Sequence, residues 1–361
     1  MNDVGPVHLR AERLIVLTAT YGDGGVPASA NAFLDRLGRL KGAPPAAVLG
    51  FGDRSFPSFC GYAHAVAEAL DARGCRRLLE MKRVDRRSAQ EFAQWGRDLG
   101  AALGLDLDLR HVAERPRTAP LVLVSRETYG EAFDAPVAIL RFGAPKGRQG
   151  RPAPLPQFEA GDLLGVLPPG DDLPRFYSLA SSTGDGMVEI CVRLRPGGLC
   201  STFLHGLAIG DRIEAFVREN PSFRPAEGRA PLILIGAGAG IAPLAGFVRA
   251  NVGRRPVHLY WGGRSPVSDF LYEHELAAQL AARRLTSLST AFSRAPGERA
   301  YVQDRVAADA HRLRALIRQE AQILICGGRD MARSVAEALE RVVGLDLATL
   351  RSQRRYLEDV Y

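Results

Sequence analysis

Glycine, hydroxyl, guanidinium and aromatic side chains recur in short groups along the later two thirds of the chain. The run from Ile235 to Pro243, IGAGAGIAP, is a glycine-rich turn that follows an apolar segment and precedes a helical pattern. Glycines let the backbone approach a pyrophosphate closely, and the N-terminus of the following helix supplies free N–H groups. Such turns also occur for packing reasons alone, so this run predicts a dinucleotide site only together with other groups.

A second group follows the apolar run that ends at Phe292, and it consists of Ser293, Arg294, Arg299, Tyr301 and Gln303. A 2′-phosphate needs hydroxyl and guanidinium partners, whereas a site for NAD would favour an Asp or Glu on the ribose hydroxyl. This group therefore predicts NADPH as the dinucleotide. The alternative is an exposed loop with incidental arginines.

The third and fourth groups are Arg175-Phe176-Tyr177-Ser178 and the run GGLCST from Gly197 to Thr202. An arginine can neutralise a diphosphate, an aromatic ring can lie against a flat ring, and a hydroxyl can approach the flavin nitrogen that accepts a hydride. Taken alone, Tyr177 would be an ordinary core residue, so its interpretation depends on the neighbouring motifs.

The chain contains three segments with different patterns of strands and helices, and these segments must position the groups described above. The first hundred residues alternate strands (Leu14–Ala19, Ala46–Phe51 and Arg77–Met81) with helices, one of which opens at the capping box from Ser88 to Glu91 and runs to Leu103. Strands that alternate with helices predict a parallel sheet.

The segment 114–120 has the charge and prolines of a linker, and from Leu121 to about Arg224 short strands separated by Gly/Pro turns predict a small antiparallel barrel. After Pro231 the strand–helix alternation returns. We expect three domains: an α/β partial flavodoxin-like domain (1–110), an antiparallel β-barrel FAD domain (111–228), and an α/β NADP-binding domain of the ferredoxin-NADP reductase type (229–361).

Composition excludes several classes of protein. The net charge is +7, but the arginines are scattered, which argues against nucleic acid binding. The five cysteines form no CxxC pair, which argues against zinc and iron–sulfur sites. Ala230–Val248 is uncharged, but its glycines and Pro243 favour a strand entering a phosphate-binding turn over a membrane span. The first residues contain no apolar stretch of secretory length, so we expect a cytoplasmic protein.

Together with the run CGGRDM from Cys326 to Met331 and the run RYLEDVY from Arg355 to Tyr361, the four groups occur in an order that resembles the NADPH-dependent diflavin reductases. This family includes the flavoprotein subunit of sulfite reductase and the NADPH-haemoprotein reductases. The resemblance covers nearly the whole chain.

The resemblance implies a role for each matching position. The FAD site would comprise Arg175, Tyr177, Ser178, Gly198, Leu199, Cys200, Ser201 and Tyr361, and the NADPH site Gly238, Gly240, Ser293, Arg294, Arg299, Tyr301, Gln303 and Asp330. Cys326 and Asp359 would line the hydride path together with Ser178. Tyr361 would shield the flavin face and move before the nicotinamide can stack.

Two loops of the first domain resemble those that enclose the FMN ring in flavodoxins. The residues concerned are Thr20, Tyr21, Gly22, Gly52, Asp53 and Phe56, with Asp85 in a third loop. A flavodoxin begins with a strand and a hydroxyl-rich phosphate loop, and neither is found before Leu14. We therefore expect weak FMN retention and an N-terminally shortened chain or gene model, or a partner that supplies the rest. The helical connecting domain of larger family members is also missing.

The expected function is transfer of electrons from NADPH through FAD to FMN and then to an acceptor protein, either the sulfite reductase haemoprotein or another haem protein. One alternative is a ferredoxin- or flavodoxin-NADP reductase that uses FAD only. The other is a non-catalytic fragment. The oligomeric state is left open.

Overall fold

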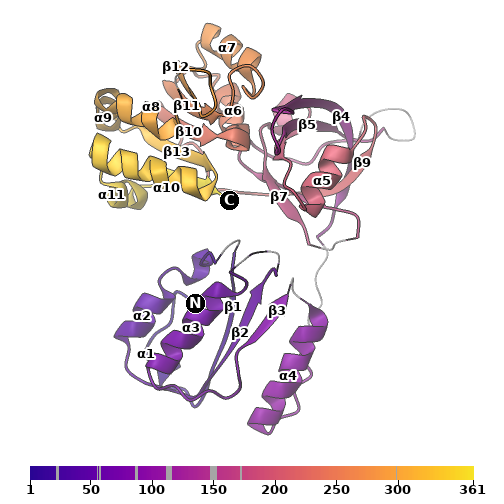
Figure 1. Cartoon of the computed structure of the whole chain (residues 1–361), viewed down its shortest axis with the longest axis vertical. Coiled ribbons are helices and arrows are strands. Elements are labelled where there is room, and N and C mark those ends of the chain that lie inside the picture. The colour runs from indigo at the N-terminus through magenta and orange to yellow at the C-terminus, as the bar shows by residue number, and fades with distance from the viewer. Residues whose placement is uncertain are drawn as a thin grey trace. The chain divides into compact units, whose positions relative to one another are not determined.

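A computed structural model describes residues 1–21, 24–54, 56, 58–85, 88–110, 116–146, 153–170, 173–297 and 299–361. The chain divides into two compact units, Met1–Arg115 and Pro116–Tyr361, most of whose elements are labelled in Figure 1. Within the described residues, no helix is both long enough and apolar enough to cross a membrane.

The first unit is a parallel sheet of strand order β1-β2-β3 with accompanying helices. Its elements are α1 (Pro6–Leu9), β1 (Leu14–Ala19), a 3-10 turn (Ala28–Ala30), α2 (Phe33–Arg39), β2 (Ala46–Gly52), α3 (Gly61–Ala72), β3 (Lys82–Asp85) and α4 (Ala89–Leu103). The Ser88 hydroxyl caps α4 by accepting a hydrogen bond from the Glu91 N–H (3.2 Å), as the sequence predicted. The alternation of strands and helices is thus confirmed.

The third predicted strand, Arg77–Met81, is wrong. Arg77 makes an isolated bridge with Ala46, and the strand proper is β3, which pairs in parallel with residues Leu49–Gly52 of β2. The apolar side chains that suggested a strand, among them Leu78 and Leu79, instead pack from a loop against the core around Trp95. Charged residues dominate β3, so its sequence carried no apolar run to reveal it.

The second unit begins with an antiparallel sheet of strand order β7-β6-β9-β4-β5-β8. Its strands are β4 (Ala119–Tyr129), β5 (Val137–Gly143), β6 (Leu163–Leu167), β7 (Arg175–Ser178), β8 (Val188–Arg193) and β9 (Arg212–Arg218). A 3-10 turn (Thr183–Asp185) follows β7, and helix α5 (Leu199–Gly206) follows β8. An antiparallel bridge between Leu179 and Ile190 joins the chain after β7 to β8, the other end of the strand order.

A parallel sheet of order β12-β11-β10-β13-β14 completes this unit. Its strands are β10 (Leu232–Ala237), β11 (Val257–Gly263), β12 (Ser287–Phe292), β13 (Gln322–Gly327) and β14 (Tyr356–Val360). A 3-10 turn (Gly238–Gly240) follows β10, and the helical segments are α6 (Ile241–Ala250), α7 (Glu273–Ala281), α8 (Val302–Ala308), α9 (Ala310–Arg318), α10 (Arg329–Ala338), a π-helical turn (Leu339–Val343) and α11 (Leu347–Ser352). The sequence did not predict β14, because only Tyr356 in this strand is fully buried.

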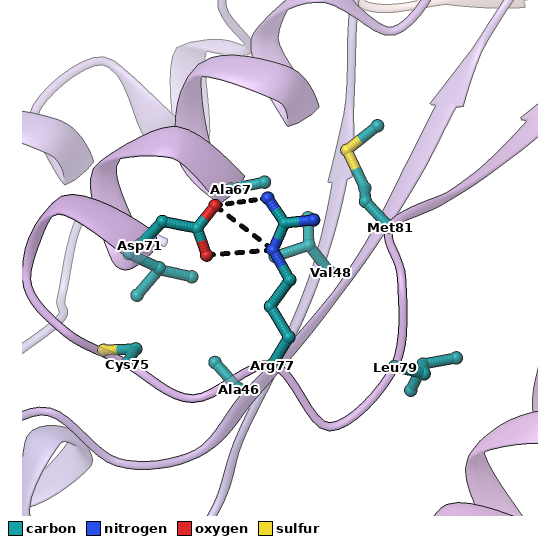
Figure 2. Close-up of a pocket in the computed structure, with 9 residues that line it drawn as sticks. Ala46, Val48, Ala67, Asp71, Cys75, Arg77, Leu79 and Met81 are labelled. Atoms are coloured by element: carbon teal, nitrogen blue, oxygen red, sulfur yellow. Dashed lines mark hydrogen bonds and ion pairs between the residues drawn. The ribbon is translucent and has the colours of Figure 1, made fainter.

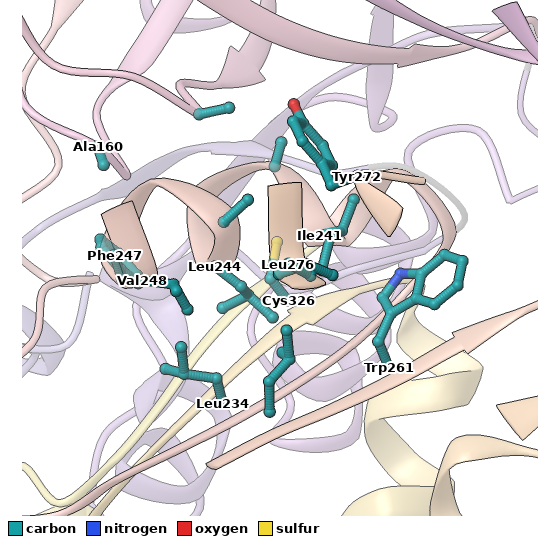
Figure 3. Close-up of a cluster of buried hydrophobic side chains, with 14 of the residues drawn as sticks. Ala160, Leu234, Ile241, Leu244, Phe247, Val248, Trp261, Tyr272, Leu276 and Cys326 are labelled. Atoms are coloured by element: carbon teal, nitrogen blue, oxygen red, sulfur yellow. The ribbon is translucent and has the colours of Figure 1, made fainter. Parts of the chain in front are cut away.

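One apolar core joins the two sheets of the second unit. Side chains of α6, including Leu244 and Phe247, pack with Leu234 of β10 and with Ala160 from the segment before β6 (Figure 3). Gly246 allows this close approach, because a Cβ there would lie 2.5 Å from the Ala180 carbonyl oxygen. Helix α6 therefore packs closely between the antiparallel and parallel sheets and joins them in one core.

A charged group, the Glu189 cluster, lies at the same boundary. Glu189 of β8 is 1% exposed and accepts hydrogen bonds from Arg249 of α6 (Nη2–Oε1, 3.1 Å) and from the Tyr272 hydroxyl (3.1 Å). It also forms an ion pair with Arg141 of β5, and Arg249 in turn bonds Glu275 of α7 (2.9 Å). Because its partners come from β5 and from helices α6 and α7 beside the parallel sheet, the cluster connects the antiparallel sheet to these helices.

Candidate active site

Three of the predicted hydride-path residues meet where β7 approaches the parallel sheet. The Ser178 hydroxyl, at the end of β7, donates a hydrogen bond to Oδ2 of Asp359 in β14 (2.6 Å). Asp359 is in turn the parallel register partner of Cys326 on β13. Residues far apart in the sequence and drawn from both sheets therefore form one group.

Burial sets the protonation of this group. Burial raises the pKa of the Asp359 carboxyl above its ordinary value, and the hydrogen bond from Ser178 counteracts part of the rise. Burial, followed by the charge of Asp359, raises the pKa of the Cys326 thiol well above its usual range. Cys326 is 1% exposed and lies among the apolar side chains beside α6 (Figure 3), so at neutral pH it is a neutral thiol.

Tyr361 lies beside this group. Its backbone N–H donates to the Gly327 carbonyl oxygen (3.2 Å), which carries the β13–β14 pairing to the end of β14. Its side chain is half exposed, and its phenol is within electrostatic reach of Cys326 and Cys191. The ring of Tyr361 is therefore accessible from solvent, while the hydrogen bond to Gly327 fixes the backbone of this residue.

Tyr177 and Arg175 lie on the β7 face opposite to Ser178, as alternation along a strand requires. The Tyr177 hydroxyl contacts the thiol of Cys200 in α5, and burial raises the pKa of this tyrosine. Arg175 donates from Nη1 to the Leu173 carbonyl oxygen (2.8 Å). The side chain of Tyr177 therefore connects β7 to α5.

The turn before α5 fits a phosphate group. Gly197 has φ +71°, and Gly198 precedes the helix, whose first N–H groups have no partner within the helix itself. The Ser201 hydroxyl accepts from the Arg195 N–H (3.1 Å) and donates to the Gly198 carbonyl oxygen (3.1 Å). Ser201 thus shapes the turn, while Leu199 is half exposed at the start of the helix.

The turn after β10 also fits a pyrophosphate, because it is rich in glycine and leads into a helix. Gly238 has φ +53°, in the region that favours glycine. A Cβ on Gly240 would overlap the Cys326 carbonyl oxygen, so this glycine lets the turn pack against the end of β13. Trp261 donates from Nε1 to the Gly238 carbonyl oxygen (3.2 Å), which fixes the turn from β11. The glycines here serve both packing and close approach.

The residues predicted for the 2′-phosphate follow β12. The Ser293 N–H donates to the Gly263 carbonyl oxygen (3.1 Å), and the Arg294 N–H donates to the Arg264 carbonyl oxygen (2.7 Å). The side chains of Arg294, Arg299 and Tyr301 are exposed, and Gln303 is partly exposed in α8. Asp330, in the first turn of α10, has a side chain that is 95% exposed.

The predicted FMN residues of the first unit lie in loops after its strands. The Thr20 hydroxyl accepts from the Tyr62 N–H (3.2 Å) at the start of α3, and Asp85 accepts from the Arg54 N–H (3.0 Å). Tyr21 is 58% exposed, and Phe56 is partly buried. Gly52 and Asp53 are partly buried after β2, and Gly22 lies outside the described residues.

A small pocket of the first unit lies away from these loops. It is lined by residues of β2, α3 and the segment before β3, and the ion pair between Arg77 and Asp71 crosses it (Figure 2). Its free volume of about 10 Å³ could hold a single water molecule. It begins at Ala46, the amino end of β2, so it is not part of the candidate FMN site.

Two segments of the chain match known protein families. The flavodoxin family model matches residues 7–95, and the oxidoreductase NAD-binding domain model matches residues 234–337. The flavoprotein alpha-component of NADPH sulfite reductase from Sodalis glossinidius is 36% identical over 238 residues, covering 58% of this chain and 39% of the relative. Its counterpart from Pectobacterium atrosepticum is 33% identical over 297 residues, covering 73% of this chain and 48% of the relative.

NADPH oxidoreductase A from Dictyostelium discoideum is 33% identical over 231 residues, covering 54% of this chain and 36% of that protein. The chain belongs to the diflavin reductase family. The family resemblance expected from the sequence is thus confirmed. The matched segments span less than half the length of these relatives, so the reaction of a whole diflavin reductase is a proposal for this chain.

Sequence reasoning missed one residue that the fold places beside the candidate site. Cys191 of β8 is 6% exposed, and its thiol lies within electrostatic reach of both Cys326 and Tyr361. Burial raises its pKa well above the usual range, so it is a neutral thiol as well. The sequence carried no signal for Cys191, because it lies in none of the motifs and its neighbours Cys326 and Tyr361 are distant in the sequence.

Proposed function

We propose that this chain is an NADPH-dependent flavoprotein reductase that passes electrons from NADPH to FAD and on to FMN or a protein acceptor. When bound, FAD accepts a hydride from NADPH and releases electrons singly. Residues 111–228 would form the FAD-binding barrel, 229–361 the NADPH-binding domain and 1–110 the FMN domain. The observation that carries the proposal is the hydrogen bond between Ser178 and Asp359 beside Cys326.

The residues around this bond are suited to hydride transfer. An ionised Asp359 would stabilise the positive charge that develops on the nicotinamide as the hydride leaves, while Ser178 holds the carboxylate in place. Cys326 is small and neutral, so it would leave room for the ring without competing as a nucleophile. Tyr177 and Tyr361 would cover the flavin from either side, and the turns at Gly198 and Gly238 would hold the phosphates.

The acceptor and the FMN are also part of the proposal. The names of two relatives point to a sulfite reductase haemoprotein as acceptor, and another haem protein would fit the same chemistry. FMN would lie between the loops that carry Tyr21 and Phe56, with Asp85 in the third loop. A reductase that stops at FAD is the second candidate, and it would lack an FMN-dependent rate.

The test is NADPH-dependent reduction of ferricyanide by the purified chain, together with its FAD and FMN content. We expect bound FAD and a rate well above that without NADPH. Protein that contains FAD but reduces ferricyanide no faster with NADPH would refute the proposal. Stimulation of haem-protein reduction by added FMN would support the diflavin route, and an FMN-independent rate would favour the FAD-only enzyme.

A further inference from the structure

The β4–β5 turn of the antiparallel sheet is fixed against the loop that follows β11. The Gly130 N–H donates to the Ser268 carbonyl oxygen (2.6 Å), and the Phe133 N–H donates to the Gly130 carbonyl oxygen (2.9 Å), which closes the turn. Gly130 has φ +65°, and a Cβ there would overlap the guanidinium of Arg264. The turn can therefore approach the parallel sheet closely only with glycine at this position.

This contact places the ring of Phe133 against two arginines. The Cζ of Arg264 lies 4.5 Å from the ring centroid, and the Cζ of Arg294 lies 4.8 Å from it. Arg264 is held by Asp269, whose two oxygens accept from Nε (3.0 Å) and Nη2 (2.8 Å) in a buried pair. Arg294 itself is exposed, and its backbone N–H is bonded to the Arg264 carbonyl oxygen.

The ring contact suits an arginine that must bind an anion. A carboxylate partner would also orient the guanidinium, but it would occupy the N–H groups and repel a phosphate. An aromatic face attracts the cation and restricts its rotamers while the N–H edge stays available. Phe133 thus limits the conformational freedom of Arg294 without occupying its hydrogen-bond donors.

We propose that Phe133 is a positioning residue that orients Arg294 toward the 2′-phosphate, and that it thereby favours NADPH over NADH. This inference rests on the proposed function, in which Arg294 binds that phosphate. The antiparallel sheet would then contribute to dinucleotide selection through a side chain that does not itself contact the nucleotide.

The experiment uses the full-length, flavin-loaded chain and measures dissociation constants for 2′,5′-ADP and 5′-AMP by titration calorimetry. For Phe133→Leu we expect the affinity for 2′,5′-ADP to fall about three- to fivefold, the range of an exposed cation–π contact, with the affinity for 5′-AMP unchanged. Phe133→Tyr keeps the ring face and should retain wild-type values. The ratio of kcat/KM for NADPH to that for NADH should fall with the loss of 2′,5′-ADP affinity.

Phe59→Leu is the matched control, because its ring also lies near two arginines, Arg54 (5.1 Å) and Arg83 (5.3 Å), in the first unit. It should leave both affinities unchanged. Phe133→Asn suits a turn and serves as a second variant if the leucine variant does not fold.

Three outcomes would overturn the inference. They are an unchanged 2′,5′-ADP affinity in the Phe133 variants, an equal loss for both nucleotides, and failure of Phe133→Tyr to retain the wild-type value. These differ from failure of the proposed function, in which the wild-type chain would show no preference for 2′,5′-ADP over 5′-AMP.

Discussion

At the scale of single residues, the bond between Ser178 and Asp359 couples a protonation equilibrium to the proposed reaction. Burial raises the pKa of Asp359, so its carboxyl takes up a proton at a higher pH than an exposed aspartate, whose ordinary value is 3.8. Between these two pKa values the folded state binds more protons than the unfolded state, so stability falls as pH rises through this window. The ionised form that the proposed reaction needs therefore carries a cost in stability.

The first prediction concerns the variant Asp359→Asn. We expect NADPH-dependent flavin reduction to slow by about a hundredfold, because the charge that stabilises the developing nicotinamide cation is lost. In the wild type the rate should fall as pH drops through the raised pKa, and in the variant this acid limb should vanish. Stopped-flow absorbance across pH measures both, with the exposed Glu340→Gln as control. A variant that keeps the acid limb would contradict the assignment.

The second prediction concerns the variant Ser178→Ala. The hydrogen bond from Ser178 lowers the pKa of Asp359, so its removal should raise that pKa further and move the acid limb of the rate to higher pH. The same stopped-flow series measures the shift. An acid limb that stays in place, or one that moves to lower pH, would show that Ser178 does not act through this carboxylate.

At the scale of elements, the Glu189 cluster links β8 to helices α6 and α7. Glu189→Ala would leave Arg249 and Arg141 with one partner fewer in a mostly buried setting, and we expect a loss of about 3–5 kcal/mol in the free energy of unfolding of the second unit. The control is Glu127→Ala, whose side chain is 46% exposed and pairs with Arg141, with an expected loss of less than about 1 kcal/mol. Urea unfolding compares the two. Equal losses would show that the cluster does not tie the sheets together.

The strands differed in how well their positions could be predicted from the sequence. Strands with a buried apolar run, such as β10, were predicted because every inward position is hydrophobic. The strand β3 was placed too early because apolar residues filled the core from a loop, and β14 was not predicted because only Tyr356 in it is fully buried. Pairing partners far away in the sequence decide such strands, and local patterns do not contain them.

The residues of the candidate site also differ in whether the sequence alone could identify them. The resemblance of the motifs to those of the diflavin reductases named Ser178, Cys326 and Asp359, and the structure brings these three together. Cys191 and Phe133 could not be found in this way, because their importance comes from contacts between the two sheets. The roles predicted for the individual site residues still require the experiments above.

At the scale of the whole molecule, the division into two units predicts that Pro116–Tyr361 works alone. The residues proposed for FAD and NADPH all lie in this unit. Expressed by itself, it should retain FAD and reduce ferricyanide with NADPH at a rate close to that of the full chain, while any FMN-dependent reduction of a haem protein is lost. Flavin analysis and steady-state rates measure this. An apo or inactive second unit beside an active full chain would contradict the division.

The Glu189 cluster also affects how the stability of the second unit depends on temperature. Taking ions out of water costs less free energy as temperature rises, because their hydration carries a strongly negative entropy, whereas the gain from apolar contact levels off. The ion pair between Glu189 and Arg249 should therefore contribute a larger share of the free energy of unfolding at high temperature and a smaller share at low temperature. On cooling, the contact between the two sheets should therefore lose stability before the hydrogen-bonded pairing within either sheet does.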